Sequence, residues 1–474
     1  NSIKGLNFQD LTEDSEKKGK LKEEKSKEGL CKGRENRVSD SNLEIGDSVE
    51  DAVAQKVEDI LEKCSHFFHL SPVPWAENGF YYEAEDAPGK HPYHEAGVYY
   101  IQEPSAMSAA ALLAPEPGDR VLDLCAAPGG KSTQLAAYLN QTGLLVANEI
   151  HSARCKILSQ NMERLGISNA IVTNEDSFTL AARFPEYFDK IMVDAPCSGE
   201  GMFRKNPEAA SEWSLANVKN CAARQSEILD NAAEMLVPGG KIVYSTCTFS
   251  PEENEQVIAS FLEQHPEFEL IRKDVPEFDH GRPDWANHIP QLAFTFRLWP
   301  HHLHGEGHFA AILQKKGSSS AHTSGKTAGL KDKNQLRLWQ EFASTVLTPG
   351  MNDFLQQGNL ILFGDQLYRL PEDAPSLEHL KVLRAGLHLG TFKKNRFEPS
   401  HALALFLGIQ DVKTSISLSL ADPSTSMFFN GETINCDTQK GWCLVCIEGF
   451  SAGWGKASGF ILKSHYPKGL RKII

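Results

Sequence analysis

Two cysteines follow short apolar runs of the sequence. Such runs predict strands, and a side chain at the end of a strand can take part in chemistry. Cys197 follows the run 189–193, and Cys247 follows the run 241–245. Asp194 precedes Cys197 by three residues. A buried, inert thiol is the usual state of a single cysteine. Two thiols and a carboxylate at strand ends instead suggest nucleophilic catalysis, in which a thiolate forms a transient bond to its substrate.

Methylation at carbon 5 of a pyrimidine is a reaction that needs such a set of groups. Carbon 5 is a poor nucleophile, but a thiolate that adds to carbon 6 makes carbon 5 electron-rich. A nearby cation or helix N-terminus would favour that thiolate. Asp194 is positioned to hydrogen-bond ring N3 and steady the adduct. The second cysteine could help release the product once a base has taken the carbon-5 proton.

A third apolar run leads into a glycine turn. Residues 120–124 predict a buried strand, Pro128-Gly129-Gly130 a turn, and residues 132–139 a helix. Glycines let the backbone approach a ligand closely, and a helix N-terminus favours a carboxylate or phosphate. An ordinary strand–helix turn is one interpretation. A P-loop is another, but it requires glycine at position 125, where this chain has Cys125.

The next two strands favour a nucleotide-like cofactor in a Rossmann-type fold. The apolar run that begins at Leu144 ends in Glu149, about 20 residues after the glycines, where such folds place a carboxylate for ribose hydroxyls. The run that begins at Ala170 ends in Asp176, within reach of a base ring.

Strands and helices alternate from about residue 120 to residue 263. This alternation predicts an α/β fold, a Rossmann-like domain with a mostly parallel, doubly wound sheet. Ligands in such sheets bind beyond the carboxyl ends of the strands. We therefore expect the residues at or just after these strand ends to converge on one cleft: Cys125, Glu149, Asp176, Asp194, Cys197 and Cys247.

These motifs resemble the NOL1/NOP2/Sun family of RNA cytosine-5 methyltransferases, and within it the F type of bacterial 16S rRNA methyltransferases. The resemblance rests on residues 125–133, 194–199, 245–248 with 251–255, and 305–309. It covers 75–315 strongly, and paired Pro-Cys and Thr-Cys motifs on one Rossmann sheet are distinctive for the RNA enzymes. The tail from 449 to 472 resembles the PUA-like, RNA-binding C-terminal region of the F type.

The resemblance implies methyl transfer from S-adenosylmethionine to carbon 5 of a cytidine in RNA, with 16S rRNA in the small subunit as the expected substrate and tRNA as the alternative. Cys247 would be the nucleophile, Cys197 would help release the product, and Asp194 would lie near the methyl group and the cytosine. Glu149 would contact the ribose of the cofactor and Asp176 its adenine. No metal is expected, and the cofactor would lie on Cys125, Ala126, Ala127, Pro128, Gly129, Gly130 and Lys131.

Two other classes of protein share parts of this pattern. A non-catalytic RNA-binding or ribosome-assembly factor with the same fold would need neither thiol. A DNA cytosine methyltransferase would carry its nucleophile in the Pro-Cys motif and would not need a Thr-Cys motif. The intact pair of motifs therefore favours the RNA enzyme.

The composition divides the chain into five predicted parts. Residues 1–74 form a small, partly flexible N-terminal region, because the first 50 are rich in Lys, Glu and Ser and have few large apolar residues. Residues 75–315 form the methyltransferase domain and residues 316–333 a linker rich in Gly, Ser and Lys. An intermediate α/β segment, 334–395, and a β-rich, PUA-like RNA-binding domain, 396–474, complete the chain.

Charge and composition bear on partners and compartment. The 474 residues carry a net charge of −14, yet the segment 381–474 has 12 basic and 6 acidic residues. Such a basic end suggests contact with a polyanion, although a chance excess on a solvated face is the alternative. We find no run of 18 apolar residues and no apolar signal segment, and the ten cysteines are scattered. These features predict a cytoplasmic protein without a membrane partner. With the family resemblance, we expect a monomer that binds RNA rather than DNA.

Overall fold

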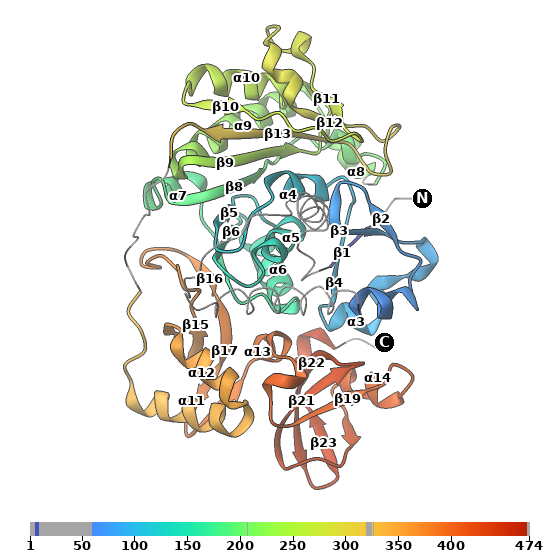
Figure 1. The fold of residues 1–474 in the computed structure, drawn as a ribbon, viewed down its shortest axis with the longest axis vertical. Helices are drawn as coiled ribbons and strands as arrows, with labels where there is room; N and C mark the ends of the chain where they lie inside the picture. Colours follow the sequence, from blue (N-terminus) through green and yellow to red (C-terminus); the bar gives the residue numbers. More distant parts are fainter. Residues whose placement is uncertain (1–4, 9–58, 206, 319–324, 326, 472–474) are drawn as a thin grey trace, which may run out of the picture.

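A computed structural model describes residues 5–8, 59–205, 207–318, 325 and 327–471. Its described strands form four sheets (Figure 1). A ten-stranded sheet lies in the upper and central part of the view, a small N-terminal sheet lies beside it, and two C-terminal sheets lie below.

The ten-stranded sheet has a parallel centre with antiparallel edges. Its five parallel strands lie in the order β9-β8-β5-β6-β7. Short antiparallel strands extend one edge, and β16 pairs antiparallel with β7 at the other. The bounds are β5 (Arg120–Asp123), β6 (Leu144–Asn148), β7 (Ala170–Thr173), β8 (Phe188–Asp194), β9 (Leu236–Thr246), β10 (Phe268–Leu270), β11 (Asp279–His280), β12 (Phe296–Leu298), β13 (His308–Lys315) and β16 (Val382–Ala385).

Helices cover both faces of this sheet, because each central strand is apolar on both sides. In β5, Val121 packs with one layer of helices and Leu122 with the other. Continuous apolar strands of this kind are typical of parallel sheets buried on both faces. The predicted α/β, Rossmann-like, doubly wound fold is therefore confirmed. The first layer is α4 (Met107–Leu113), α5 (Gly130–Leu139) and α6 (Ser152–Arg164), and the second is α7 (Ser177–Arg183), α9 (Leu215–Met235) and α10 (Glu255–Gln264).

The N-terminal sheet departs from the expectation for the first residues of the chain. Its order is β2-β3-β1-β4, and β1 (Gly5–Phe8) comes from the segment that we expected to be flexible. Two strands from later in the chain, β3 and β4, hold β1 between them and satisfy its backbone groups. The other bounds are β2 (Ser71–Val73), β3 (Ala76–Tyr81) and β4 (Tyr99–Gln102).

The apolar residues Val53, Val57, Ile60 and Leu61 predict an amphipathic helix over 51–64, and the structure describes only part of it. Residues 59–65 are helical, whereas residues 51–58 lie outside the described residues. The short helix α3 (Pro92–Glu95) follows and packs against β4.

The C-terminal part of the chain consists of two further sheets with helices against them. The first contains β14 (Leu360–Phe363), β15 (Gln366–Arg369), β17 (Leu387–Lys393) and β18 (Arg396–Pro399), with α11 (Lys333–Val346) and α12 (Pro349–Gln357) nearby. The last contains β19 (Ser415–Leu418), β20 (Thr433–Asn435), β21 (Gly441–Ile447), β22 (Phe450–Ser458) and β23 (Ile461–Ser464), with α13 (His401–Phe406) and α14 (Pro423–Asn430).

These sheets confirm a β-rich C-terminal region. Cys443 and Cys446 are fully buried in β21, as expected for cysteines that pack in a strand. The pairing of β16 with β7 joins the intermediate segment to the methyltransferase sheet, and the β2–β3 pair spans position 74. The five-part division of the chain stays a prediction. Among the described residues, no helix is both long enough and apolar enough to cross a membrane.

Candidate active site

The glycine turn after β5 lets the backbone lie close to a ligand. Gly129 has a φ of +117°, a conformation that glycine adopts easily, and α5 begins at Gly130. A Cβ on Gly130 would lie 3.1 Å from the Tyr100 ring and 3.2 Å from Gln102, so a larger residue would not fit without a shift. Burial raises the pKa of the Cys125 thiol, so this cysteine stays protonated and lines the turn.

Glu149 is buried where β6 ends, and it connects that strand end to the turn. Its carboxylate accepts a hydrogen bond of 2.8 Å from the His151 backbone N–H and lies 3.3 Å from Arg154. Arg154 also donates to the Ala127 carbonyl at 2.6 Å. The structure thus brings the predicted ribose-binding carboxylate to the same place as the turn.

Asp176 lies farther from the centre of this arrangement and is exposed. It is the N-cap of α7, where it accepts hydrogen bonds from the Thr179 N–H at 2.7 Å and the Thr179 hydroxyl at 2.9 Å. The backbone hydrogen bond lowers the pKa of Asp176. Its contact with an adenine ring stays a prediction.

Asp123 offers an unused acceptor beneath the turn. It is fully buried at the end of β5, and one carboxylate oxygen accepts from the Ser132 hydroxyl at 2.5 Å. The other oxygen has no hydrogen-bond partner in the part of the chain that the structure describes. Burial raises the pKa of Asp123 to about 7. A cofactor with an ammonium group would supply the missing donor, so the residues present fit S-adenosylmethionine.

Asp194, at the end of β8, forms a half-buried ion pair with Lys131 of α5. Lys131 Nζ lies 2.8 Å from one carboxylate oxygen, and the Ser245 hydroxyl donates to the other at 2.8 Å. Burial by itself would raise the pKa of Asp194, but the charge of Lys131 and the hydrogen bonds from Lys131 and Ser245 act together against it, and the pKa lies below its usual value. Both members of the pair are therefore charged at neutral pH.

The two predicted cysteines meet at this edge of the sheet. Cys197 Sγ and Cys247 Sγ are 3.3 Å apart although 50 residues separate them, and both residues are half-buried. The Gly201 N–H donates to the Cys247 carbonyl at 2.9 Å, which connects the loop after Cys197 to the loop after β9. The hydrogen bond to Cys247 and burial raise the pKa of Cys197 well above its usual value. Cys197 therefore remains a thiol that can donate to its neighbour.

A buried carboxylate that the sequence did not single out holds the two cysteine loops together. Glu253 accepts from the Ser198 N–H at 3.0 Å, from the Ser198 hydroxyl, and from Gln225 of α9 at 2.8 Å. The Ser198 hydroxyl also lies 2.9 Å from the Thr248 hydroxyl. Glu253 thus positions the residues next to Cys197 and Cys247. Its place in the run 251–255 was the only signal in the sequence.

We expect Glu253→Gln to lower kcat for methyl transfer by about 10- to 100-fold and stability by about 1–3 kcal/mol, because an amide cannot accept all three hydrogen bonds. Single-turnover assays and urea unfolding would measure the two effects. Glu252→Gln is the matched control, since its carboxylate accepts only from the Ser250 hydroxyl among the described residues. An unchanged kcat in Glu253→Gln would contradict this positioning role.

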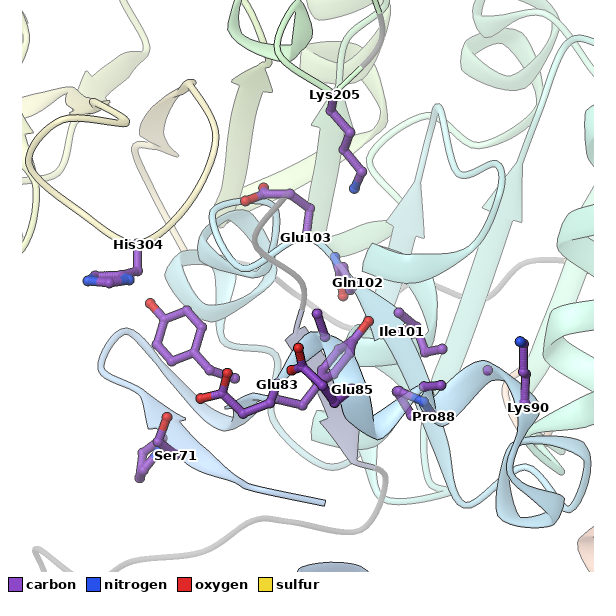
Figure 2. A pocket seen from close by; sticks show the side chains of 16 residues that line it. Ser71, Glu83, Glu85, Pro88, Lys90, Ile101, Gln102, Glu103, Lys205 and His304 are labelled. Carbon is purple, nitrogen blue, oxygen red and sulfur yellow. The ribbon is translucent and has the colours of Figure 1, made fainter. Parts of the chain in front are cut away.

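A cavity of about 1070 Å³ opens beside the site, between the N-terminal sheet and the loop before β13 (Figure 2). Tyr81, Tyr82 and His304 supply rings to its lining, and Lys205 reaches it from the loop after Cys197. Glu103 belongs both to this cavity and to the polar network described next.

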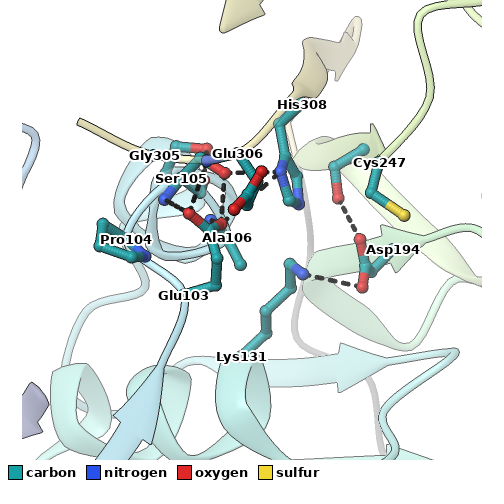
Figure 3. A network of polar contacts seen from close by, with 12 residues as sticks. Glu103, Pro104, Ser105, Ala106, Lys131, Asp194, Cys247, Gly305, Glu306 and His308 are labelled. Atoms are coloured by element: carbon teal, nitrogen blue, oxygen red, sulfur yellow. Dashed lines mark hydrogen bonds and ion pairs between the residues drawn. The ribbon is translucent and has the colours of Figure 1, made fainter. Parts of the chain in front are cut away.

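The second unforeseen feature is a polar network from β4 and β13 (Figure 3). Glu103 and Ser105 lie just after β4, and the Ser105 hydroxyl is 2.8 Å from Nδ1 of His308, which begins β13. Figure 3 shows the His308 ring between this pair and the Lys131–Asp194 pair. Ser105 and His308 are 203 positions apart, so no sequence pattern joins them. Among the described residues, no cluster of potential metal ligands is present.

Comparisons with known proteins identify the family to which this fold belongs. The family model of the 16S rRNA methyltransferase RsmB/F matches residues 110–314. Three models specific to RsmF also match: its N-terminal domain at 52–104, its first C-terminal domain at 341–407 and its PUA domain at 415–472.

The ribosomal RNA small subunit methyltransferase F of Vibrio vulnificus is 32% identical over 412 residues, with 85% of each chain covered. That of Aeromonas hydrophila is 34% identical over 418 residues, which cover 85% of this chain and 86% of the relative. A solved methyltransferase homolog protein from Pyrococcus horikoshii is 32% identical, with a TM-score of 0.49, and covers 55% of this chain and 82% of its own.

The fold and the matched domains define an S-adenosylmethionine-dependent RNA methyltransferase. The chain belongs to the family of ribosomal RNA small subunit methyltransferases F, because it matches such relatives over most of their length and carries all three RsmF-specific domains. The family predicted from the sequence motifs is thereby confirmed.

Proposed function

We propose that this protein methylates carbon 5 of a cytidine in 16S rRNA through a covalent bond between Cys247 Sγ and carbon 6 of the base. The observation that carries the proposal is the pair of thiols 3.3 Å apart beside a charged Lys131–Asp194 pair. The family makes rRNA the substrate class, and this geometry supports the choice of atom and mechanism. A binding protein would need neither thiol.

S-adenosylmethionine would bind the turn from Cys125 to Lys131, with Glu149 at its ribose and Asp176 near its adenine. Asp123 would meet its ammonium group. When bound, the cofactor supplies a methyl group on a positively charged sulfur.

The catalytic steps assign one task to each residue. Cys247, as the thiolate, adds to carbon 6, and the electron pair of the ring double bond becomes available at carbon 5. The Cys197 thiol donates a hydrogen bond to Cys247 before the addition. The Lys131 ammonium lies close enough to Cys247 for the two groups to interact electrostatically.

After methyl transfer, carbon 5 carries both a methyl group and a hydrogen. A base must take that proton, so that the double bond forms again and the Cys247 thiolate leaves. Cys197 lies within reach of this step. Asp194, ionised and held by Lys131 and Ser245, would accept a hydrogen bond from ring N3 once the adduct has gained a proton there.

The C-terminal region supports RNA as the partner. The matched PUA domain spans 415–472, within the basic end of the chain. Lys456 of β22 and Lys463 of β23 are exposed on neighbouring strands, where they would contact phosphates. We further propose that the protein acts as a cytoplasmic monomer without a DNA or membrane partner.

Bisulfite sequencing of 16S rRNA and tRNA from a strain that lacks this protein tests the proposal. We expect at least one cytidine of 16S rRNA to lose its protection from deamination, and the wild-type gene to restore it. Loss of protection in tRNA alone would transfer the activity to tRNA. No change in either RNA would contradict a cytosine-5 methyltransferase.

A further inference from the structure

His308 occupies a place next to the proposed nucleophile. In the antiparallel pairing of β13 with β9, Phe309 lies opposite Thr246 in the last pair of the ladder, and His308 and Cys247 are the residues next to this pair. The His308 side chain is only 4% exposed. Its ring lies between the Glu103–Ser105 pair and the Lys131–Asp194 pair (Figure 3).

The hydrogen-bond network fixes which ring nitrogen of His308 carries the proton. Glu103 accepts from the backbone N–H groups of Ser105 at 3.1 Å, Ala106 at 2.9 Å and Glu306 at 2.8 Å, so it acts as a carboxylate acceptor. The Ser105 hydroxyl gives its only hydrogen to Glu103. Ser105 Oγ therefore accepts from His308 Nδ1–H at 2.8 Å, which leaves Nε2 with a free lone pair.

The ring is also neutral. Burial, followed by the charge of Lys131, lowers the pKa of His308 to about 4, although Glu103 and Asp194 act in the opposite direction. Within the described ranges, Nε2 has no hydrogen-bond donor from the protein. His308 therefore presents a permanent acceptor at neutral pH, beside the cysteine that would bond to the base.

We propose that His308 Nε2 accepts a hydrogen bond from the 4-amino group of the target cytosine and so distinguishes cytosine from uracil. The inference rests on the proposed function, since it requires a pyrimidine bonded to Cys247. The 4-amino group is the only donor on the neutral cytosine ring, so a fixed acceptor that faces the base can pair with no other group. Uracil has a carbonyl oxygen at that position, which would face the lone pair of Nε2.

Asp194 cannot provide this discrimination in the same way. Each of its oxygens already accepts a hydrogen bond, one from Lys131 and one from Ser245. The two bases differ at N3, because uracil carries a hydrogen there and cytosine does so only when protonated. Ionised Asp194 would accept a hydrogen bond from either N3–H equally well. The choice of base therefore falls to His308.

Covalent trapping tests this role. Fluorine at carbon 5 prevents the release of Cys247, so the adduct with RNA persists on a denaturing gel. We would prepare 16S rRNA transcripts with 5-fluorocytidine or 5-fluorouridine at the position mapped by bisulfite sequencing. Rates of adduct formation would be measured in single turnover with S-adenosylmethionine for the full chain and for His308→Phe, which keeps a ring but no nitrogen.

We expect the wild-type protein to trap 5-fluorocytidine at least about 10-fold faster than 5-fluorouridine, because an unpaired buried acceptor is unfavourable. His308→Phe should reduce this ratio to about 1–2 by slowing the cytidine reaction selectively. Ser105→Ala removes the hydroxyl that holds the proton of His308 on Nδ1, so it should lower the ratio in part. This variant provides a second test if His308→Phe fails to fold. His302→Phe, at a half-exposed histidine paired with Asp279, should leave the ratio unchanged.

Equal slowing of both reactions by His308→Phe, with the ratio kept, would show a structural role and overturn the inference. An unchanged ratio in a folded Ser105→Ala protein would overturn the tautomer argument. The absence of any adduct between wild-type protein and 5-fluorocytidine RNA would instead contradict the proposed covalent mechanism, so the two failures can be distinguished.

Discussion

We expect Cys247→Ala to abolish methyl transfer while leaving the fold intact. Alanine removes the only group proposed to bond to carbon 6, and carbon 5 of an unactivated cytosine does not attack the methyl donor at a useful rate. We expect the rate to fall by more than roughly 10⁴-fold, in keeping with the loss of other covalent nucleophiles. Transfer of radiolabelled methyl groups to 16S rRNA would measure it.

The position of Cys247 and a control variant separate this effect from damage to the fold. Cys247 is half-buried in the loop that follows β9, so its truncation leaves no large cavity in the core. Cys436→Ala provides a control at a half-buried cysteine in the C-terminal region. Cofactor affinity should be unchanged in both variants. Methyl transfer near the wild-type rate in Cys247→Ala would refute the covalent mechanism.

Cys197→Ala should give the opposite behaviour, an RNA–protein adduct that accumulates. The first addition depends on Cys247, which remains, whereas release of the methylated base loses the help of Cys197, whose Sγ lies 3.3 Å from Cys247 Sγ. Turnover should fall by about 10²–10⁴-fold, the usual contribution of a positioned acid or base. The complex should resist denaturation on a gel in the presence of S-adenosylmethionine and 16S rRNA.

The double variant Cys197→Ala/Cys247→Ala is the control for this result, since it should form no adduct. An adduct in Cys247→Ala and none in Cys197→Ala would show that the two roles are reversed. Cys197, the cysteine of the Pro-Cys motif, would then be the nucleophile. The resemblance to the family assigns the nucleophile to the Thr-Cys motif, and the two variants test that assignment.

The trapping experiments on His308 and the kinetics of Glu253→Gln test two different roles around the thiols: choosing the base and positioning the cysteine loops. Glu253 holds the loops that carry both cysteines, so its loss should affect every RNA substrate equally. His308 faces the base, so its loss should change the choice between bases. Neither residue forms a covalent bond to the substrate in the proposed reaction.

The sequence by itself determined the class of fold and most of the site. Apolar runs that end in Cys125, Glu149 and Asp194 predict parallel strands, and the carboxyl ends of such strands share one edge. This local rule explains why Cys197 and Cys247 could be placed in one cleft from their spacing after strands. The glycine turn is predicted as the cofactor site for a second local reason, since backbone geometry favours glycine at positions 129 and 130.

Tertiary structure alone decided the contacts between distant segments. Glu103 and Ser105 precede His308 by about two hundred residues, and their hydrogen bonds depend on how the N-terminal sheet packs beside β13. Strand β1 likewise forms only because β3 and β4 supply partners on both sides, although its own segment looks flexible. The spacing of apolar residues shows which face of one helix or strand is buried. Protonation states, tautomers and ion pairs depend on neighbours that the chain brings together only on folding.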